Sequence, residues 1–421
     1  MEALPDKEGL TVLRRLIAYA DKVFWFSGDI VSSVFDSRQE PRIPTSKIIQ
    51  AVTCLFWARM PSLNALELTA ASRLFTRWMG GPVASADTIG RVVSLVDAQG
   101  LRQGIHRIYQ RLKRNKALPD HQGMGIAVLD GHESHASYRR HCEGCLKRTI
   151  HTVNGDRTQF YHRQVVLMLL PSARPGCVPI RLLLDLEQQL SGEGEVDTAL
   201  RLLERVLVDY PRAFDLVLAD ALYATAPFFN FILAHGQHAL VVLKNEQRNL
   251  YQDVAGLFGR VAATVGAFRG RACQWWDFPD LHSWPQVNAL VRVVRSIETY
   301  SVRRQLDGKK ESLTSEWVWV TTLPADMVPT ARVVVFGHMR WDIENYAFNE
   351  LATDWNANHV FKHDPNAIES FLLIAFIAFN IFHAFVTRNL KLQIRAGRTR
   401  LFWARLIAAD LYAGLGMSLS P

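Results

Sequence analysis

The sequence predicts a mixed α/β protein whose sheet-forming middle lies between two helical regions, and three observations support this class. Apolar residues recur every three or four positions up to about residue 120, as they do in amphipathic helices. Five short apolar runs follow between residues 124 and 243, and helical patterns fill two of the intervals between them. Helical periodicity returns at Val333 and continues towards the end of the chain.

The composition excludes a mainly disordered chain and indicates a basic protein. Among 421 residues, 49% are hydrophobic and 21% are charged, which is enough apolar surface for a large core. The formal net charge of +8 favours a polyanionic partner. Five cysteines are too few for a secreted disulfide framework, and the first residues do not resemble a signal peptide, so we expect a cytoplasmic protein.

One apolar stretch, residues 367–385, is nearly long enough to cross a membrane. It carries Glu369, Asn380 and His383, and a charged group at membrane depth costs a few kcal/mol. We therefore expect a buried core helix in this stretch and no membrane partner.

Residues 1–120 are predicted to form a helical domain. A helix candidate over residues 63–75 is followed by a Gly-Gly-Pro turn and by a capped helix start at Ser85. This pair is compatible with a DNA-binding helix-turn-helix, but ordinary helix packing is favoured, because the pattern is degenerate.

Residues 121–249 are predicted to form the first part of an α/β core, with strands near 124–129, 165–170, 180–184, 216–219 and 239–243. The runs on either side of Gly176 suit an antiparallel hairpin, and the later strand–helix–strand units require some parallel strands. Residues 250–335 alternate between apolar and polar positions and are predicted to be a β-rich insertion. Residues 336–421 are predicted to complete the core with helices and to end in a basic helical tail.

Two aspartates end predicted strands, where ligands gather in open α/β sheets. Asp130 follows the first strand and Asp220 the fourth, and Glu344 lies on a later helical pattern one turn after Arg340. Three carboxylates that converge would repel one another unless they bind a cation such as Mg²⁺ or Mn²⁺. Each acid also has an ordinary structural interpretation, as a turn, cap or surface-pair residue, and Glu133 and Asp342 compete nearby.

Four short motifs, taken in their order along the chain, resemble those of the DDE transposases of bacterial insertion sequences, and most nearly those of insertion sequence family four. The matching motifs are Val-Leu-Asp-Gly-His beginning at residue 128, Leu-Ala-Asp-Ala-Leu-Tyr at residue 218, Trp-Val-Trp-Val-Thr-Thr-Leu at residue 317 and Arg-Trp-Asp-Ile-Glu-Asn at residue 340. Asp220 follows Asp130 by 90 residues and Glu344 follows Asp220 by 124, which leaves room for the β-rich insertion that the family places there.

This resemblance implies an RNase H-like catalytic core and a helical DNA-binding domain over residues 1–120. It implies that Asp130, Asp220 and Glu344 hold two Mg²⁺ or Mn²⁺ ions and that Arg340 takes part in catalysis. The chain departs from the family's last-helix signature at two positions, because Gly337 stands at the Tyr position and Leu351 at the Lys position. Lys244 or Lys362 are the candidates to replace the missing lysine.

A Cys-x-x-Cys pair, Cys142 and Cys145, is flanked by His132, His135, His141 and His151, and His135 and His141 are the candidate partners for a structural Zn²⁺. An unmetallated pair in a loop is the alternative, because no second such pair is present.

Basic residues next to the first aspartate are candidates for DNA phosphate contacts, namely Arg139, Arg140, Lys147 and Arg148. A solvated face is the alternative for such a cluster. Trp284 is a candidate for stacking on an unpaired base, although tryptophans in a small β subdomain more often pack against one another.

The function implied is DNA transposition: divalent-metal-dependent cleavage at transposon ends, then transfer of the 3′-end into target DNA. The partners implied are the terminal inverted repeats and target DNA, bound by a homodimer, in a bacterial cytoplasm at the nucleoid. Two alternatives stay open, an RNase H-like structure-selective nuclease and a domesticated, inactive DNA-binding protein.

Overall fold

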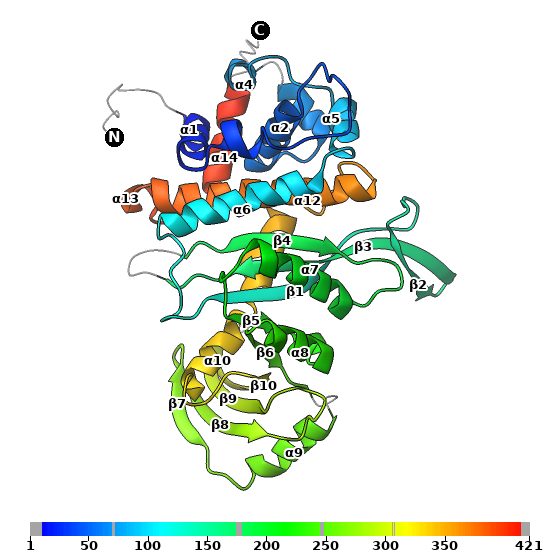
Figure 1. Ribbon diagram of the computed structural model, residues 1–421. Coiled ribbons are helices and arrows are strands. Elements are labelled where there is room, and N and C mark those ends of the chain that lie inside the picture. The colour runs from blue at the N-terminus through cyan, green and yellow to red at the C-terminus, as the bar shows by residue number, and fades with distance from the viewer. Residues whose placement is uncertain are drawn as a thin grey trace. The chain divides into compact units, whose positions relative to one another are not determined.

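The protein folds into two compact units, each assembled from segments that are distant in the sequence. The computed structural model describes residues 11–69, 72–173, 179–244, 248–304, 306 and 308–413 (Figure 1). The first unit comprises residues 1–119, 131–193 and 345–421, and the second comprises residues 120–130 and 194–344. The predicted mixed α/β class is confirmed. The units are composed differently from the four consecutive ranges expected, because packing joins the helical ends of the chain to strands from its middle.

The first unit is mostly helical. Its longer helices are α1 (Val12–Phe24), α2 (Thr45–Trp57), α5 (Ala86–Val93), α6 (Ala98–Arg114), α12 (Pro365–Ala384) and α14 (Arg400–Ala413). Shorter elements are η1 (Phe26–Ile30), α3 (Leu63–Leu68), α4 (Arg73–Met79), α11 (Asn349–Thr353), η5 (Phe385–Asn389) and α13 (Leu392–Arg395). The single helix expected over residues 63–75 is wrong, since α3 ends at Leu68 and α4 begins at Arg73.

Helix α12 is the core helix of the first unit, as expected for its apolar stretch. Residues 365–389 are long and apolar enough to span a membrane, yet their most apolar window is 100% buried inside the structure. The helix packs against α2, α5 and α6, and α6 runs alongside it (Figure 1).

Three polar residues of α12 have partners in the first unit. Glu369 pairs with Arg102 of α6. Asn380 accepts a hydrogen bond from the backbone N–H of Leu183 at 3.0 Å and donates to its carbonyl at 2.8 Å. His383 Nε2 lies 2.8 Å from a carboxylate oxygen of Glu350. These partners lower the cost of placing the three side chains in or beside the core, because each keeps at least one hydrogen bond.

The strands of the first unit are β2 (Leu146–Thr152), β3 (Gly155–Leu169) and β4 (Leu182–Gln188), together with the later part of β1 (Ile126–Ser137). Strand β3 pairs antiparallel with both β2 and β4. The pairing of β3 with β4 confirms the antiparallel hairpin predicted around Gly176.

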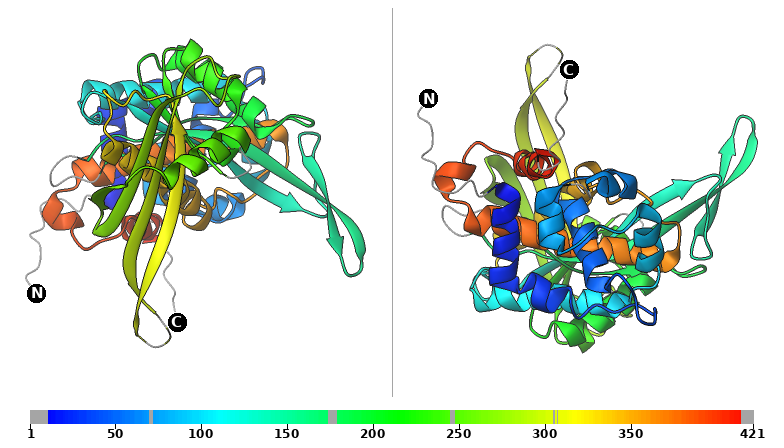
Figure 2. Two further views of the ribbon diagram at one scale, coloured as in Figure 1. Left: turned by 90° about the horizontal axis from the view of Figure 1, so that it is seen from below. Right: turned by 90° about the horizontal axis from the view of Figure 1, so that it is seen from above.

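The second unit holds a sheet in the order β1-β5-β6-β10-β9-β8-β7, of which β1 contributes its first residues. Strands β5 (Leu216–Ala219) and β6 (His238–Val242) pair parallel, and so do β1 and β5. Antiparallel strands continue from β6: β10 (Lys310–Thr321), β9 (Val291–Arg303), β8 (Arg271–Leu281) and β7 (Thr264–Phe268). Figure 2 shows β9 and β10 side by side along their length. These four strands lie in the range predicted to be β-rich.

Helices α7 (Glu195–Asp209), η3 (Ala221–Tyr223), α8 (Ala226–Ala234), α9 (Arg248–Phe258) and α10 (Thr330–Met339) complete the second unit. Helix α10 packs against β5, β6, β7 and β9. Its Gly337 faces the indole of Trp319 on β10, and a Cβ at this position would lie 2.3 Å from the ring. Trp319 is 1% exposed and stacks in parallel on Trp317, so the ring has little freedom to move.

Replacing Gly337 by alanine is expected to destabilise the second unit by about 1–3 kcal/mol, because the added methyl overpacks the contact with Trp319. Equilibrium unfolding measures the change. Substitution Val335→Ala, at an exposed position of the same helix, is the matched control and should change stability by less than about 0.5 kcal/mol. Adding Trp319→Phe to Gly337→Ala should recover part of the loss; equal stabilities for Gly337→Ala and wild type would contradict this contact.

The buried His383 predicts acid sensitivity of the first unit. Burial and the nearby Arg400 lower the pKa of His383 to about 4, although Glu350 acts to raise it. Because the folded pKa lies below the unfolded value of about 6.5, stability is lost as pH falls from about 6.5 towards 4, by about 2 kcal/mol at pH 5.

Substitution His383→Gln keeps a donor for Glu350 and removes the titration. The variant should therefore lose less stability than the wild type between pH 7.5 and pH 5, as measured by urea unfolding. The other histidines are common to both proteins and cancel in the difference. Parallel pH profiles for the two proteins would show that His383 does not carry this dependence.

Candidate active site

The register between β1 and β5 places Asp130 level with Asp220. Ile126 pairs with Leu216 and Val128 with Leu218, so every partner lies 90 residues further along the chain. Continuing this register by two residues matches Asp130 to Asp220, which follows the last residue of β5. Neighbouring strands are about 4.8 Å apart, so the two carboxylates leave the same edge of the sheet side by side.

Asp220 is held in place by the turn that it starts. Its side chain accepts a hydrogen bond from the backbone N–H of Leu222 at 2.8 Å and thereby caps the 3₁₀ turn η3. This is the ordinary cap interpretation of a post-strand aspartate, and the structure shows it to hold. Because only one oxygen of the Asp220 carboxylate is used in the cap, the side chain can bind a second group through its remaining lone pairs.

Arg340 joins Glu344 to Asp130. Its Nη1 lies 3.0 Å from Glu344 Oε1 and 3.3 Å from Asp130 Oδ2, and its guanidinium carbon lies 3.9 Å from the centre of the Trp341 ring. Arg340 ends helix α10, and Glu344 begins the π-helical turn η4 (Glu344–Phe348). The expected pair one turn apart is present, and π-helical turns occur frequently at functional sites.

The electrostatics of Asp130 are unfavourable for an isolated carboxylate. Burial raises the pKa of Asp130 to about 7; Arg340 acts to lower it, and the carboxylates of Asp220, Glu344 and Glu195 act to raise it further. A buried acid surrounded by other acids is typical of sites that bind cations or transfer protons.

Glu195 is an acid of this cluster that the sequence interpretation did not include. It is the first residue of α7 and accepts a hydrogen bond from the hydroxyl of Tyr223 at 2.9 Å. Burial raises the pKa of Tyr223 well above its usual value, as do Glu195, Asp130 and Asp220, so the hydroxyl stays protonated and donates. The only sequence signal for Glu195 was an acid at a helix start, which is a common feature of helices.

The competing acid Glu133 has a different environment. It forms a two-pronged ion pair with Arg148 in the first unit, with distances of 2.6 and 2.7 Å. Arg148, a predicted phosphate contact, is therefore engaged with a carboxylate. Asp342 lies between Arg340 and Glu344 on the same segment.

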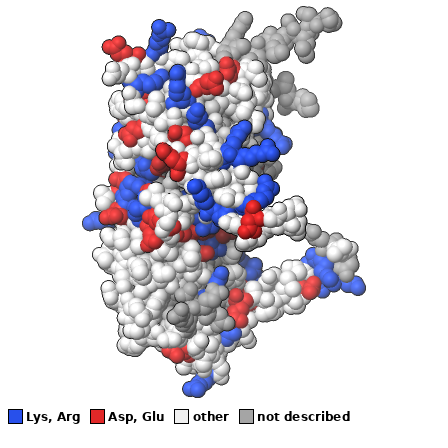
Figure 3. Space-filling view, turned by 90° about the vertical axis from the view of Figure 1, so that its right-hand side faces the viewer, with Lys and Arg blue, Asp and Glu red and all other residues white. Residues whose placement is uncertain are grey.

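The other predicted DNA contacts are exposed. Arg139, Arg140 and Lys147 lie on the loop between β1 and β2 and on β2, and Lys244 follows β6. Figure 3 shows that the Lys and Arg side chains of one face of the molecule are interspersed with Asp and Glu.

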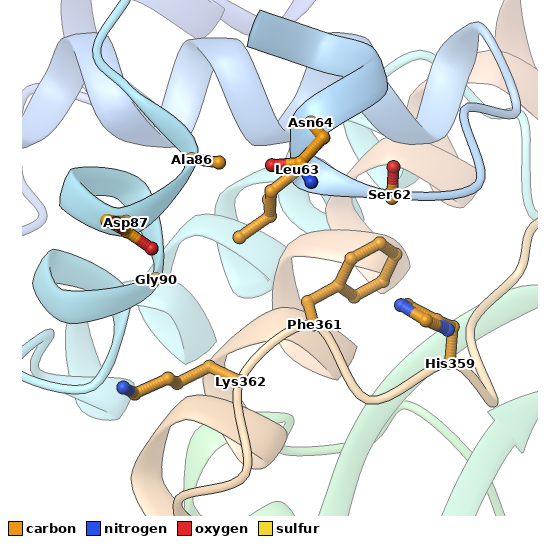
Figure 4. Close-up of a pocket in the computed structure, with 9 residues that line it drawn as sticks. All are labelled: Ser62, Leu63, Asn64, Ala86, Asp87, Gly90, His359, Phe361 and Lys362. Carbon is orange, nitrogen blue, oxygen red and sulfur yellow. The ribbon is translucent and has the colours of Figure 1, made fainter.

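Lys362 lines a pocket of the first unit. The pocket is bounded by α3, by α5 and by the segment from His359 to Lys362 (Figure 4). The stem of Lys362 lies against Gly90 of α5, and its exposed end is available to an anion.

Trp284 packs within the second unit. Its ring centre lies 5.1 Å from that of Phe229 on α8, and the side chain is half-buried. This placement agrees with the packing alternative for the tryptophans of the insertion. Trp275 and Trp276 also pack: Trp275 is 8% exposed, and Trp276 makes an edge-to-face contact with Phe258.

The Cys-x-x-Cys pair gathers partners other than those expected. Cys142 and Cys145 lie together with His162 and His363 in the first unit. His141 instead stacks on Phe160, and this group of four contains neither His141 nor His135.

The match to known families decides what kind of domain this is. Residues 181–381 match the family model of the transposase DDE domain, and no curated protein matches the chain. The chain carries a transposase DDE domain. The predicted resemblance to DDE transposases is therefore confirmed. The matched range contains Asp220, Arg340 and Glu344 of the DDE domain but begins after Asp130, which the β1–β5 register adds to the acidic cluster.

Substitution Asp130→Asn is expected to stabilise the DDE domain when no Mg²⁺ or Mn²⁺ is added. Because the folded pKa of about 7 lies above the unfolded value, the carboxylate becomes more destabilising as pH rises from about 4 to about 7 and stays so above pH 7. The free energy of unfolding that Asp130→Asn gains over the wild type should thus be larger at pH 8 than at pH 5, by about 1–3 kcal/mol. Urea unfolding of both proteins at the two pH values measures it, and an equal or smaller gain at pH 8 would refute the assigned electrostatics.

Proposed function

We propose that this protein is a DNA transposase that cleaves at transposon ends and transfers the 3′-end into target DNA. The observation that carries the proposal is the convergence of three acids in a transposase DDE domain. Asp130 and Asp220 are level on adjacent parallel strands, and Arg340 links Asp130 to Glu344.

The donor set suits two Mg²⁺ or Mn²⁺ ions. Carboxylate oxygens are the hard ligands that these ions prefer, and a cation would relieve the repulsion among the carboxylates, which adds to the effect of burial in raising the pKa of Asp130. When bound, two such ions supply activation of the attacking oxygen and stabilisation of the leaving oxygen. Asp130, Asp220 and Glu344 would hold them, and Glu195 adds a fourth carboxylate to the negative field.

Arg340 has a positioning role in this proposal. It is 6% exposed, its Nη1 is fixed between Asp130 and Glu344, and its planar guanidinium stacks on Trp341. A guanidinium fixed in this way orients both carboxylates and offers further N–H donors to a phosphate oxygen. Hydrolysis at the transposon end leaves a 3′-hydroxyl. Its oxygen then attacks a phosphodiester of the target in line, which forms a new phosphodiester and releases the 3′-oxygen of the cut target strand as a hydroxyl.

We infer an RNase H-like core for residues 121–249 and a helical DNA-binding role for residues 1–120. The parallel strands β1, β5 and β6 with acids at their carboxyl ends support the first inference. The basic residues proposed to contact DNA phosphates are Arg139, Arg140, Lys147, Arg148, Lys244 and Lys362, with Trp284 proposed at an unpaired base. We further propose membership of insertion sequence family four, a homodimer on DNA, and a bacterial cytoplasmic protein at the nucleoid.

The departures from the family signature have local explanations. Gly337 stands at the Tyr position because Trp319 fills the space beside α10. Leu351 stands at the Lys position and is 5% exposed, so this position contributes to packing rather than to phosphate binding. The exposed Lys244 and Lys362 are the proposed replacements.

Substitution Glu344→Gln should abolish Mn²⁺-dependent cleavage of labelled transposon-end DNA, with a loss on the order of a thousandfold. The change keeps the shape of the side chain and removes one metal-ligand charge. Asp342→Asn, two residues earlier on the same segment, is the matched control and should keep most of the activity. Full activity of Glu344→Gln, or loss in Asp342→Asn alone, would overturn the assignment of the third acid.

The products of that reaction separate the two alternative functions. A transposase joins the labelled 3′-end to target DNA, whereas a structure-selective nuclease cuts and never joins. A domesticated binding protein would retain salt-sensitive DNA binding and show neither cutting nor measurable Mn²⁺ binding.

A further inference from the structure

Four metal-binding side chains converge in the first unit, and as thiols and imidazoles they differ in chemistry from the acids of the DDE domain. They are Cys142 and Cys145 from the loop between β1 and β2, His162 from β3, and His363 from the segment before α12. One ligand atom from each lies within 4.8 Å of all the others. The DDE match and the proposed reaction give these residues no role.

Four of the six distances between the ligand atoms are those of a tetrahedral zinc site. The two sulfurs lie 3.7 Å apart, and His162 Nε2 lies 3.3 Å from each of them. His363 Nε2 lies 3.5 Å from the Cys145 sulfur. A tetrahedron with zinc–sulfur bonds of about 2.3 Å and zinc–nitrogen bonds of about 2.0 Å has edges of about 3.3–3.8 Å. The remaining two distances, from His363 to Cys142 and to His162, do not exceed 4.8 Å, so one ion could bind all four atoms after adjustment of the side-chain torsions.

The local fold supports this arrangement. The Cys145 N–H donates to the Cys142 carbonyl at 3.2 Å, and the Cys142 N–H lies 3.3 Å from the Cys145 sulfur, which closes a tight turn. Gly144 permits the approach to the next segment, because a Cβ there would lie 3.0 Å from a ring carbon of Pro365. Asp364 caps α12 through the Ala367 N–H, and this cap fixes the residue after His363.

Burial and chemistry favour a structural ion over a disulfide. Cys145 and His162 are 6% and 3% exposed, whereas Cys142 and His363 are half-buried and leave a route of entry. The sulfur–sulfur distance of 3.7 Å is far from the bonded distance of about 2.05 Å. Two thiols and two imidazoles are a common ligand set for structural Zn²⁺, and all four positions of the tetrahedron are taken by protein.

We propose that Cys142, Cys145, His162 and His363 bind one structural Zn²⁺. The ion ties the loop after β1 and strand β3 to the start of the core helix α12. It thereby fixes segments of the first unit that are more than 200 residues apart in sequence. In this site His162 and His363 take the places that the sequence predicts for His135 and His141. His141 stacks on Phe160, and His135 Nδ1 lies 2.5 Å from the Ser134 hydroxyl.

The test measures metal in tag-free full-length protein, produced with zinc and purified without chelator. The wild type should contain about one zinc per chain. Cobalt substitution should give the absorption of a tetrahedral thiolate site. Folded wild-type protein that holds no more zinc than the Cys142→Ser/Cys145→Ser double variant, or that lacks a thiolate-to-cobalt band, would overturn the proposal.

Matched variants then identify the ligands. His363→Asn and Cys145→Ser should lose most of the zinc and lower the melting temperature, whereas His141→Asn and Cys273→Ser should keep it. If His141→Asn loses zinc and His363→Asn retains it, the proposed ligand set is wrong. Should His363→Asn fail to fold, the cobalt spectrum of the wild type decides. Asp220→Asn should retain full zinc, which separates this site from the acids of the DDE domain.

Discussion

The parallel pairing of β1 with β5 is the constraint on which the acidic site depends. A constant offset of 90 residues between partners makes Asp130 and Asp220 neighbours, and a slip of one residue would turn one carboxylate to the opposite face. The strand residues before both acids are buried, so apolar packing fixes this register. Glu344 joins this site without lying on a neighbouring strand, because Arg340, at the end of α10, contacts both Glu344 and Asp130.

Two buried acids show how differently the protein uses a carboxylate. Glu350 in the first unit receives hydrogen bonds from His383, Trp355 and Arg400, and these partners hold its pKa below the usual range despite burial. Asp130 is also buried, but further carboxylates surround it and its pKa is raised. The first arrangement supports a folded core, whereas the second maintains a repulsion that a bound cation would remove. Such a repulsion is expected where function, rather than stability, determines the residues.

Local pattern in the sequence predicted much of the fold and part of the site. Apolar runs bounded by turns located the strands, and an acid after each of two such runs indicated Asp130 and Asp220. The partners of Cys142 and Cys145 could not be predicted, because His162 and His363 come from β3 and from the start of α12. Glu195 was missed for a related reason: an acid at a helix start is common, and only tertiary packing brings it near Asp130. The break between α3 and α4 shows that apolar periodicity alone does not locate a helix end.

Gly337 bears on whether this chain is a decayed copy of a transposase. A lost aromatic side chain would leave a cavity beside α10, since the core around a deleted ring relaxes only partly. Instead the indole of Trp319 occupies the space so closely that even a methyl group at position 337 would overlap it. Trp319 of β10 fills the space beside Gly337, and Arg340 contacts both Asp130 and Glu344. A filled space at this position is what a well-packed core requires, and it supports the proposal that the domain is intact.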